Sequence, residues 1–193
     1  IVGGMLCLWL VERDGAFAGM SWGETALAAL FQSVTARTAG FSTLPMSELA
    51  YPSLFVLLLL MFVGGGPCST AGGIKVTTFG VLTLQGLALA RHKWQAAAFG
   101  RRVPERVLST ATAVLSVYTL VLLGGLLLLL VFESRNHAHA ADTGLFMDLA
   151  FEATSALGTV GLSTGITGDL GTGSRLVLVV LMLLGRVGPL ALA

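Results

Sequence analysis

The sequence predicts an all-α membrane protein made of repeated units, each consisting of a span, a short re-entrant helix with its loop, and a second span. The first observation behind this prediction is composition: the 193 residues are 55% hydrophobic and only 11% charged, whereas soluble domains carry about 25% charged residues. A small folded chain cannot hide so much apolar surface from water, so lipid must be its solvent. This composition excludes a soluble enzyme and a disordered chain, and the net charge of +1 argues against a nucleic-acid partner.

The second observation is an internal repeat. Three blocks of sequence recur in the same order, at offsets of 120 or 121 residues. Repeats with discontinuous membrane elements are typical of transport proteins. The matched blocks are Phe31-Gln32 with Phe151-Glu152, 38–43 with 159–164, and 60–64 with 181–185.

The third observation is the length of the apolar segments, since a helical span needs about 20 apolar residues. Segment 107–132 has 26 residues without a charge and predicts a full span, as does 176–193, which Arg186 interrupts. Segments 25–36 and 145–157 are too short to span and predict re-entrant or interfacial helices. The first 11 residues are apolar and predict half a span, so we expect the chain to be a fragment of a longer membrane protein.

Segment 51–90 contains a single charge, Lys75. As one helix it would be about 60 Å long, twice the roughly 30 Å hydrocarbon core. Its middle, 64–73, holds five glycines and one proline. We therefore predict a span broken by non-helical backbone, which a bilayer tolerates only where that backbone is buried in protein or lines a watery cavity.

The distribution of charge predicts the orientation. Segment 91–106 carries five basic residues and one acid, whereas the other loops together carry three basic residues and eight acids. The positive-inside rule then places 91–106 in the cytoplasm, and both re-entrant segments enter from the outside. The expected organisation is a first repeat over 1–90, a basic cytoplasmic linker over 91–106, and a second repeat over 107–193.

A Thr-x-Gly sequence follows each short helix. In potassium filters, backbone carbonyls replace the hydration shell of the ion, and glycine permits the backbone angles that aim them. A helix C-terminus adds partial negative charge near a cation. We therefore predict a potassium-type selectivity filter, the alternative being a helix-turn whose glycine serves packing. The predicted filter residues are Thr38, Ala39, Gly40, Phe41, Thr159, Val160, Gly161 and Leu162.

Segments 33–43, 64–76 and 185–189 resemble the Ktr/Trk/HKT potassium transporters, and their sequences are most similar to those of the KtrB-type translocating subunits. The resemblance implies four M1–pore–M2 repeats around one pore, of which this chain matches the third and fourth. It also implies a homodimer in a bacterial cell membrane and a cytoplasmic nucleotide-binding regulatory subunit of the KtrA/TrkA type. Cys68 and Ser42 depart from the usual glycine and asparagine, but both filter glycines remain.

The resemblance further implies an intramembrane gate below the filter, formed by a glycine-rich loop; the alternative is a static kink. The predicted gate-loop residues are Gly64, Gly65, Gly66, Pro67, Cys68, Ser69, Thr70, Ala71, Gly72 and Gly73. A charge deep in a span is functional by default, so we expect Arg186 to control cation passage, unless it forms a structural pair. Lys75 either does similar work or extends toward the cytoplasm. Arg37 is expected to brace the filter from behind.

The predicted function is potassium transport through the pore-forming subunit of an uptake system, with coupling to Na⁺ left open. No bound cofactor and no metal beyond the transported K⁺ are expected, nor is catalysis. One alternative is an unrelated channel or solute carrier with re-entrant loops. A second, an intramembrane enzyme, requires a Ser/His or Asp pair within the spans, and the sequence offers none.

Overall fold

The structure, a computed structural model, describes residues 1–67, 69, 71–92, 97–98, 101–134 and 144–188. Within these residues the chain is helical, with two short 3-10 turns and one minimal hairpin that the sequence did not predict. The helices are α1 (Val2–Glu12), α2 (Trp22–Thr35), α3 (Tyr51–Phe62), α4 (Val76–Ala90), α5 (Glu105–Glu133), α6 (Leu145–Leu157) and α7 (Thr172–Val187). The turns are Met46–Glu48 and Ile166–Gly168, and the hairpin pairs β1 (Ala97–Ala98) with β2 (Arg101–Arg102).

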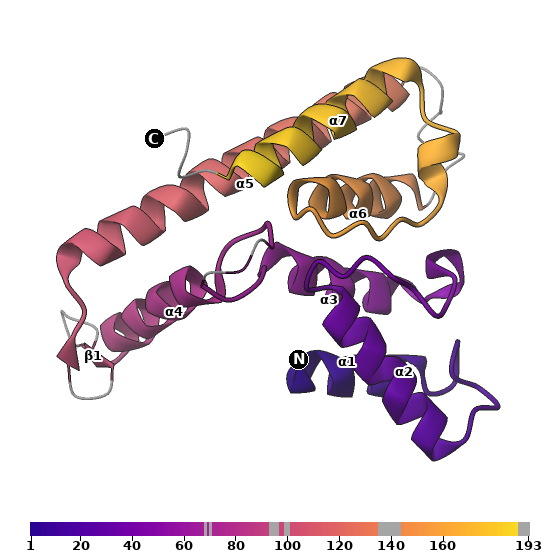
Figure 1. Cartoon of the computed structure of the whole chain (residues 1–193), viewed down its shortest axis with the longest axis horizontal. Helices are drawn as coiled ribbons and strands as arrows, with labels where there is room; N and C mark the ends of the chain where they lie inside the picture. The colour runs from indigo at the N-terminus through magenta and orange to yellow at the C-terminus, as the bar shows by residue number, and fades with distance from the viewer. Residues whose placement is uncertain (68, 70, 93–96, 99–100, 135–143, 189–193) are drawn as a thin grey trace.

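The helices form two groups that follow the same order along the chain. In the first group, α1 packs on α2 and α3, and in the second, α5 and α7 lie side by side and both pack on α6 (Figure 1). Contact between α3 and α6 joins the groups, and α4 runs from the end of α3 toward the start of α5 (Figure 1). The two helices predicted to be re-entrant, α2 and α6, are thus each held against the apolar helices of their own group.

Local sequence signals set where several helices begin. Ser21 caps α2: its hydroxyl accepts from the Glu24 backbone N–H at 3.4 Å, and the Glu24 carboxylate accepts from the Ser21 backbone N–H at 2.8 Å. This capping box satisfies two N–H groups that a helix start leaves free, and these bonds, the one from the Ser21 backbone foremost, lower the pKa of the Glu24 carboxyl. Pro104 precedes α5, and Pro52 lies in the first turn of α3, where a missing N–H costs nothing.

Helix α5 is the one described helix that is both long and apolar enough to cross a bilayer. Its 29 residues would span about 43 Å at about 1.5 Å each. Helices α1, α3 and α4 are apolar but shorter. The break predicted within 51–90 is confirmed, because α3 ends at Phe62 and α4 begins at Val76.

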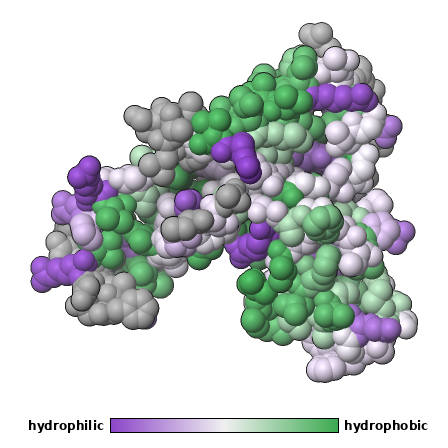
Figure 2. All heavy atoms as spheres, viewed as in Figure 1, coloured by the Kyte–Doolittle hydropathy of each residue, from purple (hydrophilic) through white to green (hydrophobic). Residues whose placement is uncertain are grey.

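Two buried clusters form the core. One gathers around Leu8, Leu57 and Phe151 between the first group and α6, and the other lies between α5, α6 and α7. Helix α6 is buried at every position from 149 to 157. Large apolar side chains nevertheless cover much of the outside, notably along α7 (Figure 2), which is the surface expected of a chain whose solvent is lipid or further protein.

One buried glutamate in each group joins the end of one helix to the beginning of another. Glu12, at the end of α1, accepts from the backbone N–H of Ala50 at 2.8 Å, and Glu133, at the end of α5, accepts from that of Gly171 at 3.0 Å. Ala50 and Gly171 are the N-cap residues of α3 and α7, and each glutamate is 1% exposed. The two contacts lie 121 residues apart, so the repeat extends to these buried carboxylates, which the sequence analysis had counted only as loop charges.

Candidate ion-conduction site

The two Thr-x-Gly loops have the same unusual backbone. Thr38 and Gly40 have φ of 71° and 74°, and Thr159 and Gly161 have φ of 52° and 93°. Left-handed φ is uncommon for a β-branched residue such as threonine, and such strain clusters at functional sites. The same two positions of each loop are therefore held in a conformation that only a specific requirement would maintain.

The structure brings the two loops together at their glycines. A Cβ placed on Gly40 would lie 2.5 Å from the carbonyl oxygen of Val160 and 3.6 Å from the Cα of Gly161. The loops therefore approach each other with no room for a side chain at Gly40. Within the part of the chain that the structure describes, no three His, Cys, Asp or Glu side chains gather as a metal site would require.

Each loop is fastened to its own short helix. Gln32 donates its side-chain N–H to the Ser42 hydroxyl at 3.2 Å. At the equivalent place, the Glu152 carboxylate accepts from the Ser163 hydroxyl at 2.5 Å and from the Thr164 backbone N–H at 3.0 Å. Sequence analysis matched Phe31-Gln32 with Phe151-Glu152 but assigned them no role; the structure shows that they hold the segment that follows each loop.

The glycine-rich segment 64–73 forms a loop with a closed base, although Cys68 and Thr70 lie outside the described residues. Gly64 N–H bonds to the Ile74 carbonyl at 2.9 Å, Ile74 N–H to the Phe62 carbonyl at 3.2 Å, and Val76 N–H to the Gly65 carbonyl at 3.1 Å. These bonds pair the end of α3 with the start of α4. We call segment 64–73 the gate loop, after the role that the sequence predicts for it.

The gate loop contacts both Thr-x-Gly loops. The Arg37 guanidinium donates to the carbonyl of Val63 and, at 2.9 Å, to that of Gly64. The Gly72 backbone N–H donates to the Thr159 hydroxyl at 3.1 Å. Arg37 was expected to brace the filter from behind; the bonds that its side chain makes lead to the end of α3 and the first residue of the gate loop.

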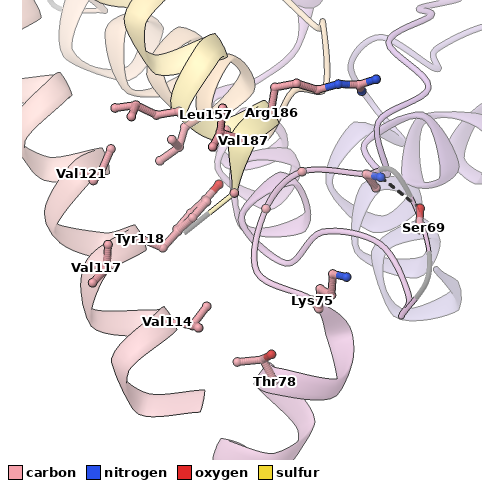
Figure 3. A pocket seen from close by; sticks show the side chains of 16 residues that line it. Ser69, Lys75, Thr78, Val114, Val117, Tyr118, Val121, Leu157, Arg186 and Val187 are labelled. Atoms are coloured by element: carbon pink, nitrogen blue, oxygen red, sulfur yellow. Dashed lines mark hydrogen bonds between the residues drawn. The ribbon is translucent and has the colours of Figure 1, made fainter. Parts of the chain in front are cut away.

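A cavity of about 280 Å³ lies beside the gate loop, between α4, α5 and the end of α7. Arg186 and Lys75, the two charges singled out in the sequence, both line it. In Figure 3 their charged ends extend toward the same side, that of Ser69, whereas Tyr118 and the valines of α5 form the opposite wall. The side chains of Arg186 and Lys75 therefore both lie beside the gate loop.

The sequence matches a family model over its whole length. The model describes the TrkH family, "Cation transport protein", and covers residues 1–193. Ktr system potassium uptake protein B of Vibrio alginolyticus is 34% identical over 98% of this chain and 40% of its own length. Potassium/sodium uptake protein NtpJ of Enterococcus hirae is also 34% identical, over 97% of this chain and 41% of its own. The chain thus spans about two fifths of these relatives.

The fold is similar to a solved structure, that of the potassium transporter TrkH from Vibrio parahaemolyticus. The TM-score is 0.74 at 26% identity, and the match covers 99% of this chain and 41% of that one. The predicted all-α membrane fold with span–pore helix–span repeats is confirmed, and the matching family is one of cation transporters rather than enzymes. The chain belongs to the TrkH family of cation transport proteins.

Proposed function

We propose that this chain forms part of the pore of a potassium uptake system in a bacterial cell membrane, where it passes the bilayer several times. The observation that carries the proposal is the meeting of two Thr-x-Gly loops with matching left-handed residues, in contact with a glycine-rich loop. Backbone carbonyls arranged in this way replace the hydration shell of a potassium ion. The names of the relatives, which are potassium uptake proteins, support the same ion.

In this proposal the filter consists of 38–41 and 159–162 and works through its carbonyl oxygens. The gate loop, 64–73, obstructs the path below it, and Arg186 and Lys75 set a positive barrier to cations beside that loop. The basic segment 91–106 faces the cytoplasm, as the positive-inside rule requires. Potassium is the transported ion and not a resident cofactor.

Partners and a second ion belong to the same proposal. We infer a homodimer, as the resemblance implies, and a cytoplasmic nucleotide-binding regulatory subunit of the KtrA/TrkA type; the word "system" in the relatives' names supports a further subunit. Sodium coupling is supported by one relative named as a potassium/sodium uptake protein. Purification of the full-length protein with and without its regulatory subunit, followed by mass measurement, tests both partners.

The test of the function is growth rescue. The full-length protein, expressed in a bacterium that lacks its own potassium uptake systems, is expected to restore growth in low-potassium medium and to take up Rb⁺ as a tracer for K⁺. The matched control is the same protein carrying both Gly40→Ser and Gly161→Ser, with membrane expression checked by immunoblot. Growth that stays at the level of the empty vector, with the protein present in the membrane, would overturn the proposal.

A further inference from the structure

The two repeats differ at one pair of equivalent positions in a way that matches their difference in backbone. The first repeat has Arg37 before its Thr-x-Gly loop and a second span broken after Phe62. The second repeat has Gly158 at the position of Arg37, 121 residues on, and its second span, α7, continues to Val187. The arginine is therefore present where the helix is interrupted and absent where the helix continues.

The contacts of Arg37 explain this match. A helix end leaves carbonyl groups without partners, and a cation placed there is favoured by the helix dipole. Arg37 donates to the carbonyls of Val63 and Gly64, the two residues that follow α3. Bonds from a charged donor are roughly twice as strong as neutral ones. The residue that precedes one filter loop thus donates hydrogen bonds to the end of the helix that leads into the gate loop.

The other end of the gate loop is fixed to the other filter loop. The Gly72 N–H bonds to the Thr159 hydroxyl at 3.1 Å. The fit is close: a Cβ placed on Gly72 would lie 2.6 Å from that hydroxyl oxygen and 2.6 Å from the Gly158 carbonyl oxygen. The base of the gate loop therefore connects the two filter loops, with a charged contact at one end and a neutral contact at the other.

We propose that Arg37 and Thr159 are positioning residues that clamp the closed gate loop to the filter, so that the gate opens only when the clamp is released. The inference rests on the proposed function, because it assigns a mechanical link to that filter and that gate. Thermodynamic coupling is reciprocal, so an ion-dependent shift of the Thr159 loop changes the gate, and opening of the gate changes the inner end of the filter. The neutral Gly72–Thr159 contact is the weaker of the two and is released first.

Gly72→Ala tests the Thr159 side without altering a filter residue. The added methyl group must push the gate loop away from Gly158 and Thr159, so the initial rate of Rb⁺ uptake should rise about threefold to tenfold, as for the loss of one neutral hydrogen bond. Gly80→Ala in α4 is the matched control, since a Cβ there meets nothing within 4 Å. A merely structural lesion would lower uptake together with membrane expression, whereas a released clamp raises uptake at equal expression.

Arg37→Met tests the other contact and should also raise uptake at equal expression. Arg37→Lys should raise uptake less than Arg37→Met does, because lysine keeps the positive charge but lacks the forked donor. If Arg37→Met does not reach the membrane, Arg37→Lys decides alone, with a smaller rise expected. Because both contacts hold one loop, the double variant Arg37→Met with Gly72→Ala should show less than the product of the two single effects.

The outcomes separate the two proposals. If the wild-type protein takes up Rb⁺ but Gly72→Ala and the Arg37 variants behave like Gly80→Ala, the clamp is overturned and the transport function stands. Lowered uptake at equal expression, or two effects that multiply independently, also overturns the clamp. If the wild-type protein itself takes up no Rb⁺, the proposed function fails and the clamp fails with it.

Discussion

Gly40 and Gly161 occupy equivalent positions but different surroundings, and this difference leads to a prediction. Gly40→Ser places a side chain 2.5 Å from the Val160 carbonyl oxygen, whereas at Gly161 the nearest atom is the Gly40 Cα at 3.6 Å. Both residues have positive φ, which disfavours any side chain. We expect both substitutions to relax ion selectivity, Gly40→Ser more strongly, since it also displaces the opposite loop. Uptake of K⁺ and Na⁺ by each variant measures this, and unchanged ratios in both would exclude the two loops from the filter.

Glu152 provides a second residue-scale prediction. Its buried carboxylate accepts from Ser163, from Thr164 and, at 2.9 Å, from the Thr167 hydroxyl. Glu152→Gln introduces the residue that the first repeat has at Gln32 and should retain most of these bonds. Glu152→Leu removes the acceptor that these three donors share.

Thermal unfolding in detergent and the K⁺/Na⁺ uptake ratio check this prediction. Glu152→Leu should lower the melting temperature and relax selectivity, and Glu152→Gln should stay near wild type in both. Equal behaviour of the two variants would mean that these bonds do not support the filter loop.

At the scale of elements, the closed base of the gate loop makes a deletion informative. Three backbone hydrogen bonds hold the ends of α3 and α4 together, so removing three residues from 66–70 leaves the base intact. If the loop obstructs the path, the shortened protein should show increased K⁺ flux with an unchanged K⁺/Na⁺ ratio. Wild-type or lower flux in a well-expressed deletion would favour a static kink.

The sequence predicted those elements whose cause is local. The break between α3 and α4 follows from five glycines in a segment too long for one span, and α5 follows from its uncharged length. Contacts between distant segments could not be predicted in this way. The bonds from Arg37 to the end of α3 and from Gly72 to Thr159 depend on how the two repeats are packed, which periodicity and composition do not encode. Glu12 and Glu133 could have been recognised, because they share the offset of 121 residues.

At the scale of the whole molecule, two positive charges, Arg186 and Lys75, lie close to the proposed path of the ion. Arg186 is exposed at the end of α7, where it lines the cavity beside the gate loop together with Lys75. A positive charge there opposes cations, so Arg186→Gln should alter the rate of K⁺ transport while leaving expression and folding nearly intact.

The measurement is the initial rate of Rb⁺ uptake at matched expression, with Arg175→Gln as the control. Arg175 bonds to the Gly168 carbonyl, near the opposite end of the same helix. A substitution of Arg186 without effect on transport, or a structure of the whole transporter in which the guanidinium points into lipid, would refute the assignment.

The buried glutamates at the ends of α1 and α5 have a consequence for motion. Each binds the end of one helix, α1 or α5, to the N-cap residue of the second helix after it, α3 or α7. When two helices are joined at one end, their relative displacement is largest at the other end. If the re-entrant helices enter from the outside, as proposed, these contacts fix the outer ends of the paired helices, and displacement is then expected at their inner ends, where α3 is interrupted. In the proposed orientation, the inner part of the ion pathway can then rearrange while its outer entrance keeps its width.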